Sequence, residues 1–219
     1  MRSPRHTPTA PLLVAASLAG LVALGACGGG NDDSVGFGDL DATKDGFAAV
    51  MDAVYVDAGE DPEDESARHR GLRVEDCLLL DDEGIATLLA ALGTTEDRVE
   101  PRVGTLFGPI ESQQIDCGFD SEDWKVPVMV LAGTTTLTRD QLAARLGEND
   151  VFEVVDDEID GLDPETVLVL DWEDGRSYIL VEDDFFVRVN VPTDAVDDEA
   201  AAVDVLQVAV AEVERTLQP

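Results

Sequence analysis

Short β-rich runs separated by acidic turns constrain the fold of this chain more than any other feature. Three such runs lie at 166–171, 177–182 and 185–191. Asp174-Gly175 separates the first two runs, and Asp-Gly between β-rich runs is a strong hairpin signal. The acidic triplet 182–184 predicts a second turn. Because hairpins join antiparallel strands, we expect a mainly antiparallel sheet.

Other runs extend this pattern and alternate with helices. We expect further strands at 103–107, 113–119, 127–131 and 151–159, with a turn at Gly108-Pro109. Helical spacing of apolar residues predicts helices from about Thr43 to Ala58, from about Asp82 to Gly93, from Thr138 to Gly147, and from Pro192-Thr193-Asp194 to the C-terminal end. The last of these is amphipathic. Helices that interrupt hairpin strands are typical of an α+β fold. Ala90–Gly93 and Ala144–Gly147 are loosely alike, which allows two repeated helix-plus-meander units.

The N-terminus carries a targeting pattern. Arg2 and Arg5 precede an uncharged apolar stretch, and Gly25-Ala26 comes directly before Cys27. The stretch is shorter than the roughly 20 residues of a membrane-spanning helix. This arrangement resembles a bacterial lipoprotein signal peptide. The resemblance implies that residues 1–26 are a leader and that Cys27 carries lipid on the outer face of the cell membrane. A short membrane anchor and an ordinary secretory signal remain alternatives.

The residues after Cys27 form the next region. The stretch that begins with Gly28-Gly29-Gly30 is small and polar, so we expect a flexible tether over 27–40. A single extracytoplasmic domain over 41–219 would follow. The chain is 44% hydrophobic, which is enough for a substantial core.

The charge balance excludes one class of partner. The chain has 48 acidic and 14 basic residues, a net charge of −34. Such a field repels nucleic-acid phosphates, so we expect no nucleic-acid partner. Divalent cations would bind only diffusely. Acidic runs before glycine occur at 156–161 and 41–46, but neither matches a calcium-binding loop, and both fit local structure better.

The remaining cysteines form an even pair once Cys27 is assigned to lipid. In an exported chain, Cys77 and Cys117 are expected to form a disulfide. Two free buried thiols, or half of a metal site, are the alternatives. Zinc is disfavoured because His69 is the only histidine after the leader.

A family resemblance appears around Cys77. The run Glu75–Asp81, a helix ending at Ala90–Gly93, and Cys117 followed by Trp124 resemble small actinobacterial surface lipoproteins of uncharacterised function. The resemblance covers about half of the mature chain. It implies an exported domain in which a cysteine before a helix pairs with a cysteine on a following strand, and it carries no activity.

Motifs of catalysis are missing from the sequence. The chain has no nucleophile elbow, zinc-protease motif, phosphate-binding loop or dinucleotide fingerprint. We therefore expect no catalytic residues, no bound metal and no cofactor. Trp172 and Tyr178 are expected to pack in the sheet, and a ligand groove lined by them and other aromatic residues is the alternative.

These features together predict a lipid-anchored, non-catalytic binding or sensing module of the cell envelope. Its partner would be an envelope protein or a small ligand, besides the membrane itself. An accessory subunit of an envelope complex is one alternative. The other is a carboxylate-dependent hydrolase, which requires a pocket with two nearby carboxyls, one of them shielded.

Overall fold

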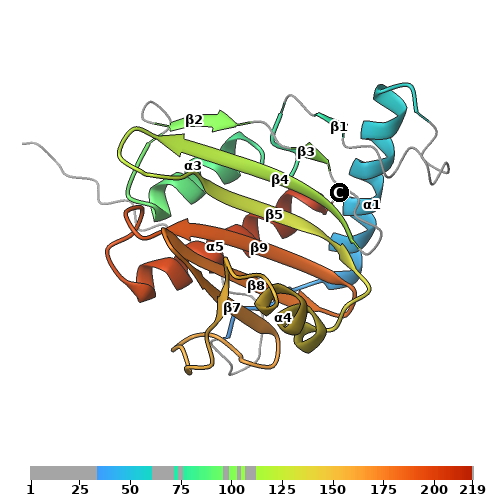
Figure 1. Cartoon of the computed structure of the whole chain (residues 1–219). Coiled ribbons are helices and arrows are strands. Elements are labelled where there is room, and N and C mark those ends of the chain that lie inside the picture. Colours follow the sequence, from blue (N-terminus) through green and yellow to red (C-terminus); the bar gives the residue numbers. More distant parts are fainter. Residues whose placement is uncertain are drawn as a thin grey trace, which may run out of the picture. The chain divides into compact units, whose positions relative to one another are not determined.

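A seven-stranded antiparallel sheet organises the fold, with strand order β2-β4-β5-β9-β8-β7-β6 (Figure 1). The computed structural model describes residues 34–60, 72–73, 76–95, 99–102, 105–106 and 112–218. The strands of this sheet are β2 (Val99–Arg102), β4 (Ser112–Ser121), β5 (Val128–Thr135), β6 (Glu153–Val154), β7 (Val167–Trp172), β8 (Gly175–Glu182) and β9 (Phe185–Pro192). Two short strands, β1 (Leu72–Arg73) and β3 (Thr105–Leu106), form a separate pair.

Four helices belong to the described residues: α1 (Leu40–Asp57), α3 (Asp82–Ala91), α4 (Arg139–Gly147) and α5 (Glu199–Leu217). Together with the antiparallel sheet they confirm the α+β class and the amphipathic C-terminal helix. None of these helices combines the length and the apolar character needed to cross a membrane. In Figure 1, α1, α3 and α5 lie behind the sheet, whereas α4 lies in front of it.

The face covered by α1, α3 and α5, here called the three-helix face, holds the larger core. Alternate residues of the strands point into it because side chains along a strand alternate between the two faces of a sheet. Buried members include Phe47 of α1, Leu88 of α3 and Leu206 of α5. Phe185 of β9 packs edge-on against both Phe47 and Phe37.

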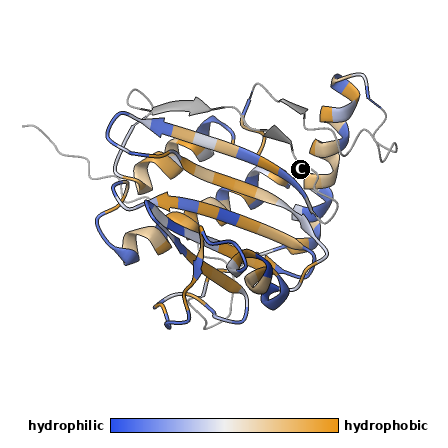
Figure 2. Ribbon diagram, viewed as in Figure 1, coloured by the Kyte–Doolittle hydropathy of each residue, from blue (hydrophilic) through white to orange (hydrophobic). Residues whose placement is uncertain are grey.

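The opposite face, here called the α4 face, holds a smaller core. Its buried residues are Leu131, Leu168, Leu170, Ile179, Val181 and Phe186, with Leu142, Ala143 and Leu146 of α4 packed against them. Figure 2 shows the central strands as hydrophobic for much of their length and α4 as largely hydrophilic. The two short helices that suggested a repeat, α3 and α4, therefore occupy opposite faces of one sheet.

The hairpins are where the acidic turns predict them, with one correction. Trp172 pairs with Gly175, so the turn residues are Glu173 and Asp174, and Gly175 is the first residue of β8. A Cβ at Gly175 would lie 2.5 Å from the Trp172 ring and 2.5 Å from the Val191 carbonyl oxygen. Close packing, and not turn geometry, therefore requires this glycine.

The first helix begins earlier than its apolar spacing predicts. Asp39 caps it by accepting a hydrogen bond from the Ala42 N–H at 3.1 Å. The residues just before this cap also lie against the body. Val35 is only 7% exposed, and the Phe37 ring contacts Phe185. The segment from Val35 to Asp39, expected in the tether, is thus packed on the domain.

The expected strand at 151–159 is mostly a loop, because the chain passes around the edge of the sheet here. Glu153 and Val154 form β6 and pair with β7, and the Val155 N–H donates one further hydrogen bond to the Val169 carbonyl oxygen of β7. Val154 packs on the α4 face, whereas Ile159 is buried on the three-helix face. Residues 156–158 between them are exposed and belong to no strand.

The last helix begins later than expected. Pro192 pairs with Gly175 and ends β9, so it does not begin the helix. The N-cap is Asp198, which accepts a hydrogen bond from the Ala201 N–H at 2.9 Å. Within the expected strand at 103–107, the structure describes only β3, and β2 lies just before it in the sequence. The expected turn at Gly108-Pro109 lies outside the described residues.

Candidate functional site

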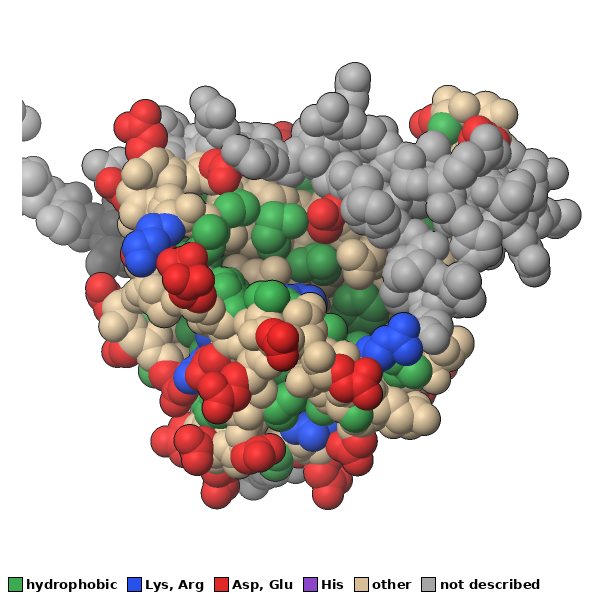
Figure 3. Space-filling view, viewed as in Figure 1, with side chains coloured by type: hydrophobic (Ala, Val, Ile, Leu, Met, Phe, Trp, Pro, Cys, Tyr) green, Lys and Arg blue, Asp and Glu red, His purple; other side chains and the backbone are tan. Residues whose placement is uncertain are grey.

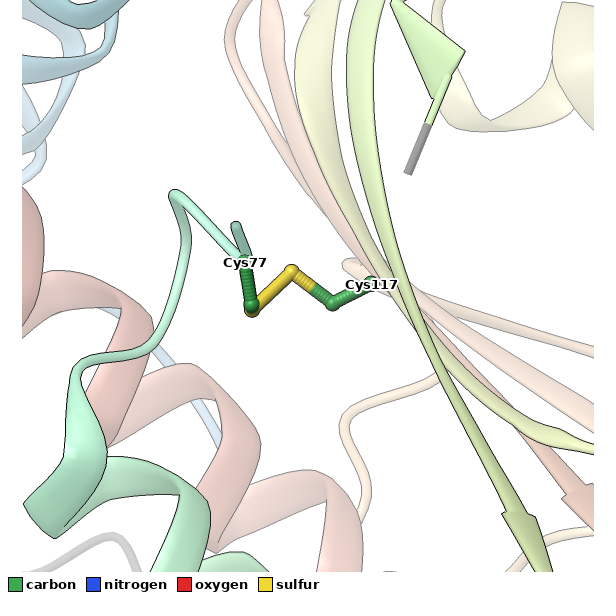
Figure 4. The surroundings of a disulfide bond; sticks show 2 residues. All are labelled: Cys77 and Cys117. Atoms are coloured by element: carbon green, nitrogen blue, oxygen red, sulfur yellow. A yellow bond between two sulfur atoms is a disulfide. The ribbon is translucent and has the colours of Figure 1, made fainter. Parts of the chain in front are cut away.

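The predicted disulfide is present. Cys77, in the segment just before α3, is bonded to Cys117 on β4, with Cα atoms 5.3 Å apart (Figure 4). Cys117 is fully buried on the three-helix face, and Leu79 and Leu80 beside Cys77 are buried too. The bond thus fastens the start of α3 to the sheet and removes the free-thiol and half-metal-site alternatives. Cys27 and His69 lie outside the described residues.

The acidic runs considered for calcium are spread over separate surfaces. Asp41 and Asp45 lie on α1, and Asp156, Glu158 and Asp160 lie on the loop after β6. Within the described ranges, no three His, Cys, Asp or Glu side chains approach closely enough to hold a metal ion.

A cleft of about 360 Å³ opens where β7, β8 and β9 meet the segment before α5. This volume lies within the usual range for small-molecule sites. The apolar part of its wall is formed by Trp172, Tyr178, Val191, Pro192, Val196 and Ala202. Trp172 and Tyr178, whose sequence pattern allowed a groove, therefore line the same cleft. Tyr178 is 1% exposed, so it forms part of the floor, whereas Trp172 is partly exposed.

Arg176 occupies the polar side of this cleft and is held by two carboxylates. Its Nε and Nη2 donate to Asp171 at 2.5 and 3.1 Å, and its Nη1 donates to Glu199. The hydrogen bonds that Arg176 donates to Asp171 raise the pKa of Arg176, and burial raises the pKa of Tyr178. Because Glu199 is the first residue of α5, this ion-pair network fixes the start of that helix to the sheet.

Two further carboxylates complete the acidic rim. Asp198 caps α5, and Asp197 is exposed beside it. Four carboxylates therefore face one guanidinium in the lining, so the cleft has a net negative charge. Such a cleft attracts a cation, and the partly exposed Trp172 ring supplies a face for a cation–π contact.

The apolar and aromatic patterns of the sequence do not single out Arg176 as a residue of the cleft. Its role depends on an ion pair with Glu199, which is 23 residues away in the sequence and is the first residue of α5. The apolar spacing of the last helix predicts an earlier start, before Glu199. The one available signal was Asp171, which is five residues before Arg176 and directly opposite it across the β7–β8 hairpin.

The hydrolase alternative needs a shielded carboxyl in the cleft, with its pKa raised. Among the described carboxyl groups, the one with a raised pKa is Glu182, and burial is the main cause. Glu182 lies at the end of β8, accepts a hydrogen bond from the Phe37 N–H, and does not line the cleft. In the cleft, Asp171 and Glu199 are both paired with Arg176.

Comparisons with protein-family models, with curated proteins and with solved structures find no match to this chain. Its function is therefore argued from its own residues.

Proposed function

We propose that this chain is a lipid-anchored, non-catalytic binding module on the outer face of the cell membrane. Three features support the proposal. The first 27 residues follow the pattern of a lipoprotein leader ending in Cys27. The disulfide suits an oxidising compartment, where such bonds persist. The cleft between the sheet and α5 offers a ligand-sized volume, and this observation carries the binding part of the proposal.

The packed segment before α1 limits how far the domain can stand from its anchor. Val35 is buried on the body, so residues 28–34 alone separate the domain from Cys27. An extended chain spans at most about 3.5 Å per residue, which places Val35 within about 28 Å of the lipidated residue. The binding module would therefore act close to the membrane surface.

The anchor predicts lipid on one residue. Wild-type protein expressed in a bacterial host with a lipoprotein pathway should incorporate radiolabelled palmitate, because two acyl chains are then attached at Cys27. Cys27→Ala should abolish the label. Cys77→Ala serves as the control for loss of a cysteine, and this variant should still incorporate the palmitate label. Palmitate incorporation by Cys27→Ala would refute the anchor.

The cleft predicts binding of a small organic cation with an apolar body. In a Trp124→Phe background, Trp172 is the single indole of the chain and reports on the cleft by fluorescence. Benzyltrimethylammonium should quench it saturably, and benzyl alcohol, which lacks the charge, should bind more weakly. Asp197→Asn should weaken binding of the cation roughly threefold, as expected for one partly screened charge. Asp157→Asn, on a separate exposed loop, is the matched control and should have no effect. Equal binding of the cation and the alcohol would contradict the proposal.

The accessory-subunit alternative is less well supported. It calls for an exposed apolar patch that a partner protein would cover. Among the described residues, the large hydrophobic side chains that are strongly exposed are Val56 and Val151, each 60% exposed. Val56 lies near the end of α1 and Val151 just after α4. They are separate positions on different elements.

A further inference from the structure

Arg188 of β9 is a buried cation whose hydrogen-bond partners are neutral. Ion pairs with carboxylates are formed by Lys44, Lys125, Arg139, Arg176 and Arg215. Arg188 forms none with any described residue, although the chain contains 48 carboxylates. Its Nε donates to Asn190 Oδ1 at 2.7 Å, and its Nη2 donates to Ser177 Oγ at 2.8 Å. Both partners are neutral.

Burial makes this charge costly. Desolvation lowers the pKa of Arg188 to about 10, well below its ordinary value. The guanidinium lies 5.4 Å from the centroid of the Phe152 ring, which supplies a cation–π contact. A buried charge without an opposite charge is unfavourable, since neutral hydrogen bonds and a ring face only partly replace hydration. An anion placed beside Arg188 would remove that deficit.

The strand register places Arg188 at the edge of a nine-residue surface on the α4 face, here called the β4–β5–β9 panel. Its three cross-strand rows are Gly118–Met129–Asn190, Asp116–Leu131–Arg188 and Gln114–Gly133–Phe186. Asp116 is the one carboxylate of the panel. It lies on β4, two strands away from Arg188 on β9, and Leu131 of β5 lies between them. The panel combines one guanidinium, three apolar side chains and two glycines.

The panel is hollowed and lies beside α4. Helix α4 packs on the same face against β6 and β7, at the opposite edge of the sheet from β2 and β4. Figure 3 shows hydrophobic side chains gathered in a hollow on this face, over β4, β5 and β9, with acidic side chains crowding the surface around α4. Leu131 and Phe186 are 8% and 6% exposed, as residues at the floor of a hollow are. Met129 is partly exposed.

We propose that the β4–β5–β9 panel binds an amphipathic carboxylate, whose carboxylate pairs with Arg188 and whose apolar chain lies on Met129, Leu131 and Phe186. Guanidinium and carboxylate are complementary in shape and charge, and within the described residues two of the five guanidinium N–H groups have acceptors. Ser177 and Asn190 hold the guanidinium in place, since the Ser177 hydroxyl also donates to Asn190 at 2.6 Å. No panel residue lines the cationic cleft, so this site is independent of the function proposed above.

The net charge of the chain gives the site an unusual salt dependence. At low ionic strength the charge of −34 repels any anion at long range. Salt screens charges farther apart than about 10 Å at 0.1 M, whereas a desolvated contact with Arg188 is screened much less. Affinity for the carboxylate should therefore rise severalfold between 20 and 300 mM NaCl. If the carboxylate were bound by an exposed surface cation, its affinity would instead fall between 20 and 300 mM NaCl.

Methionine methyl groups provide the readout. Met129 lies in the panel, and Met51 is buried on the three-helix face as an internal control. The full chain with Cys27→Ala is used, so that no attached lipid competes with the probe, and Met129→Leu assigns the signal. Titration with decanoate, below its micelle concentration, should shift the Met129 methyl resonance saturably and leave Met51 unchanged.

Three comparisons decide the outcome. Decanol and decyltrimethylammonium, at both salt concentrations, should bind at least tenfold more weakly than decanoate. Arg188→Met keeps an unbranched apolar side chain, so it should weaken decanoate binding at least tenfold while the urea midpoint stays close to that of the parent. If decanol binds as tightly as decanoate, or if Arg188→Met binds decanoate normally, the panel does not recognise a carboxylate. Head-group discrimination in the unsubstituted panel remains decisive even if Arg188→Met does not fold. A shift of Met51 equal to that of Met129 would show general detergent-like binding and also overturn the proposal.

Discussion

Glu182 shows how one residue couples the entering chain to the sheet. Its carboxylate accepts a hydrogen bond from the Phe37 N–H at 3.3 Å, beside the buried Val35. Glu214 of α5 likewise accepts from the Gly38 N–H at 3.0 Å. Two carboxylates thus hold the segment that precedes α1. Burial raises the pKa of Glu182, with the negative charges of Asp183, Glu214 and Asp163 adding to it.

The raised pKa predicts a specific pH dependence of Glu182→Gln. A carboxyl whose pKa is higher in the folded state favours folding when protonated, and this contribution is lost as the pH rises through the folded-state pKa. At pH 7 the ionised Glu182 therefore lowers the stability of the fold. A glutamine removes the charge, and its amide oxygen can still accept the hydrogen bond from the Phe37 N–H. Glu182→Gln should raise the urea midpoint at pH 7 and have little effect near pH 4. Glu173→Gln, on an exposed turn, is the control. An equal effect at both pH values would show that charge is not the cause.

At the scale of elements, the contact between α1 and α5 is decided by a glycine. A Cβ on Gly46 would lie 1.6 Å from the Leu217 carbonyl oxygen, so the end of α5 rests directly on the backbone of α1. Nothing at the level of helix propensity indicates this contact, since glycine merely lowers the propensity of the helix in which it occurs. The close approach allows Phe47 and Leu217 to be buried in the same core.

Two glycine-to-alanine substitutions should therefore have different effects. Gly46→Ala places a methyl group against fixed backbone and should destabilise the fold by at least about 2 kcal/mol, as overpacking does. Gly84→Ala, in α3, meets the ends of the Glu212 and Arg215 side chains at 3.2 and 3.3 Å, which can move, and Asp81 Oδ1 at an ordinary contact distance of 3.4 Å. Its effect should stay within about 1 kcal/mol of zero. Urea unfolding measures both. A similar loss for the two variants would mean that α1 and α5 do not touch at Gly46.

At the scale of the whole molecule, the disulfide and the two cores hold a strongly charged chain together. Closing a loop of 40 residues is worth about 4 kcal/mol in the chain-entropy model, a large part of the usual stability of a domain. The sheet buries apolar residues on both faces, with α1, α3 and α5 on one and α4 on the other. A net charge of −34 opposes compaction, and the ion pairs of Arg176 and Arg215 each join α5 to another element.

Elements with a local signal could be predicted well from the sequence. Thr138 and Gln141 form a capping box that starts α4, and the acidic pair at 183–184 turns β8 into β9. The starts of two helices differ from their apolar spacing, for different reasons. Asp39 starts α1 earlier than its apolar spacing, and Asp198 starts α5 later because Pro192 is paired with Gly175. The sequence pattern indicates the aromatic residues of the cleft, Trp172 and Tyr178, but not Arg176.

The sequence by itself indicated the four main helices, the hairpin strands β7 to β9 and the antiparallel character of the sheet, and it favoured the pairing of Cys77 with Cys117 once Cys27 is assigned to lipid. Caps, turns and apolar periods act over a few residues, so they can be read along the chain. Tertiary structure alone decided which face each helix covers, where Arg176 finds its carboxylates and why Arg188 finds none among the described residues. These outcomes depend on strand register, which brings together side chains that are far apart in the sequence.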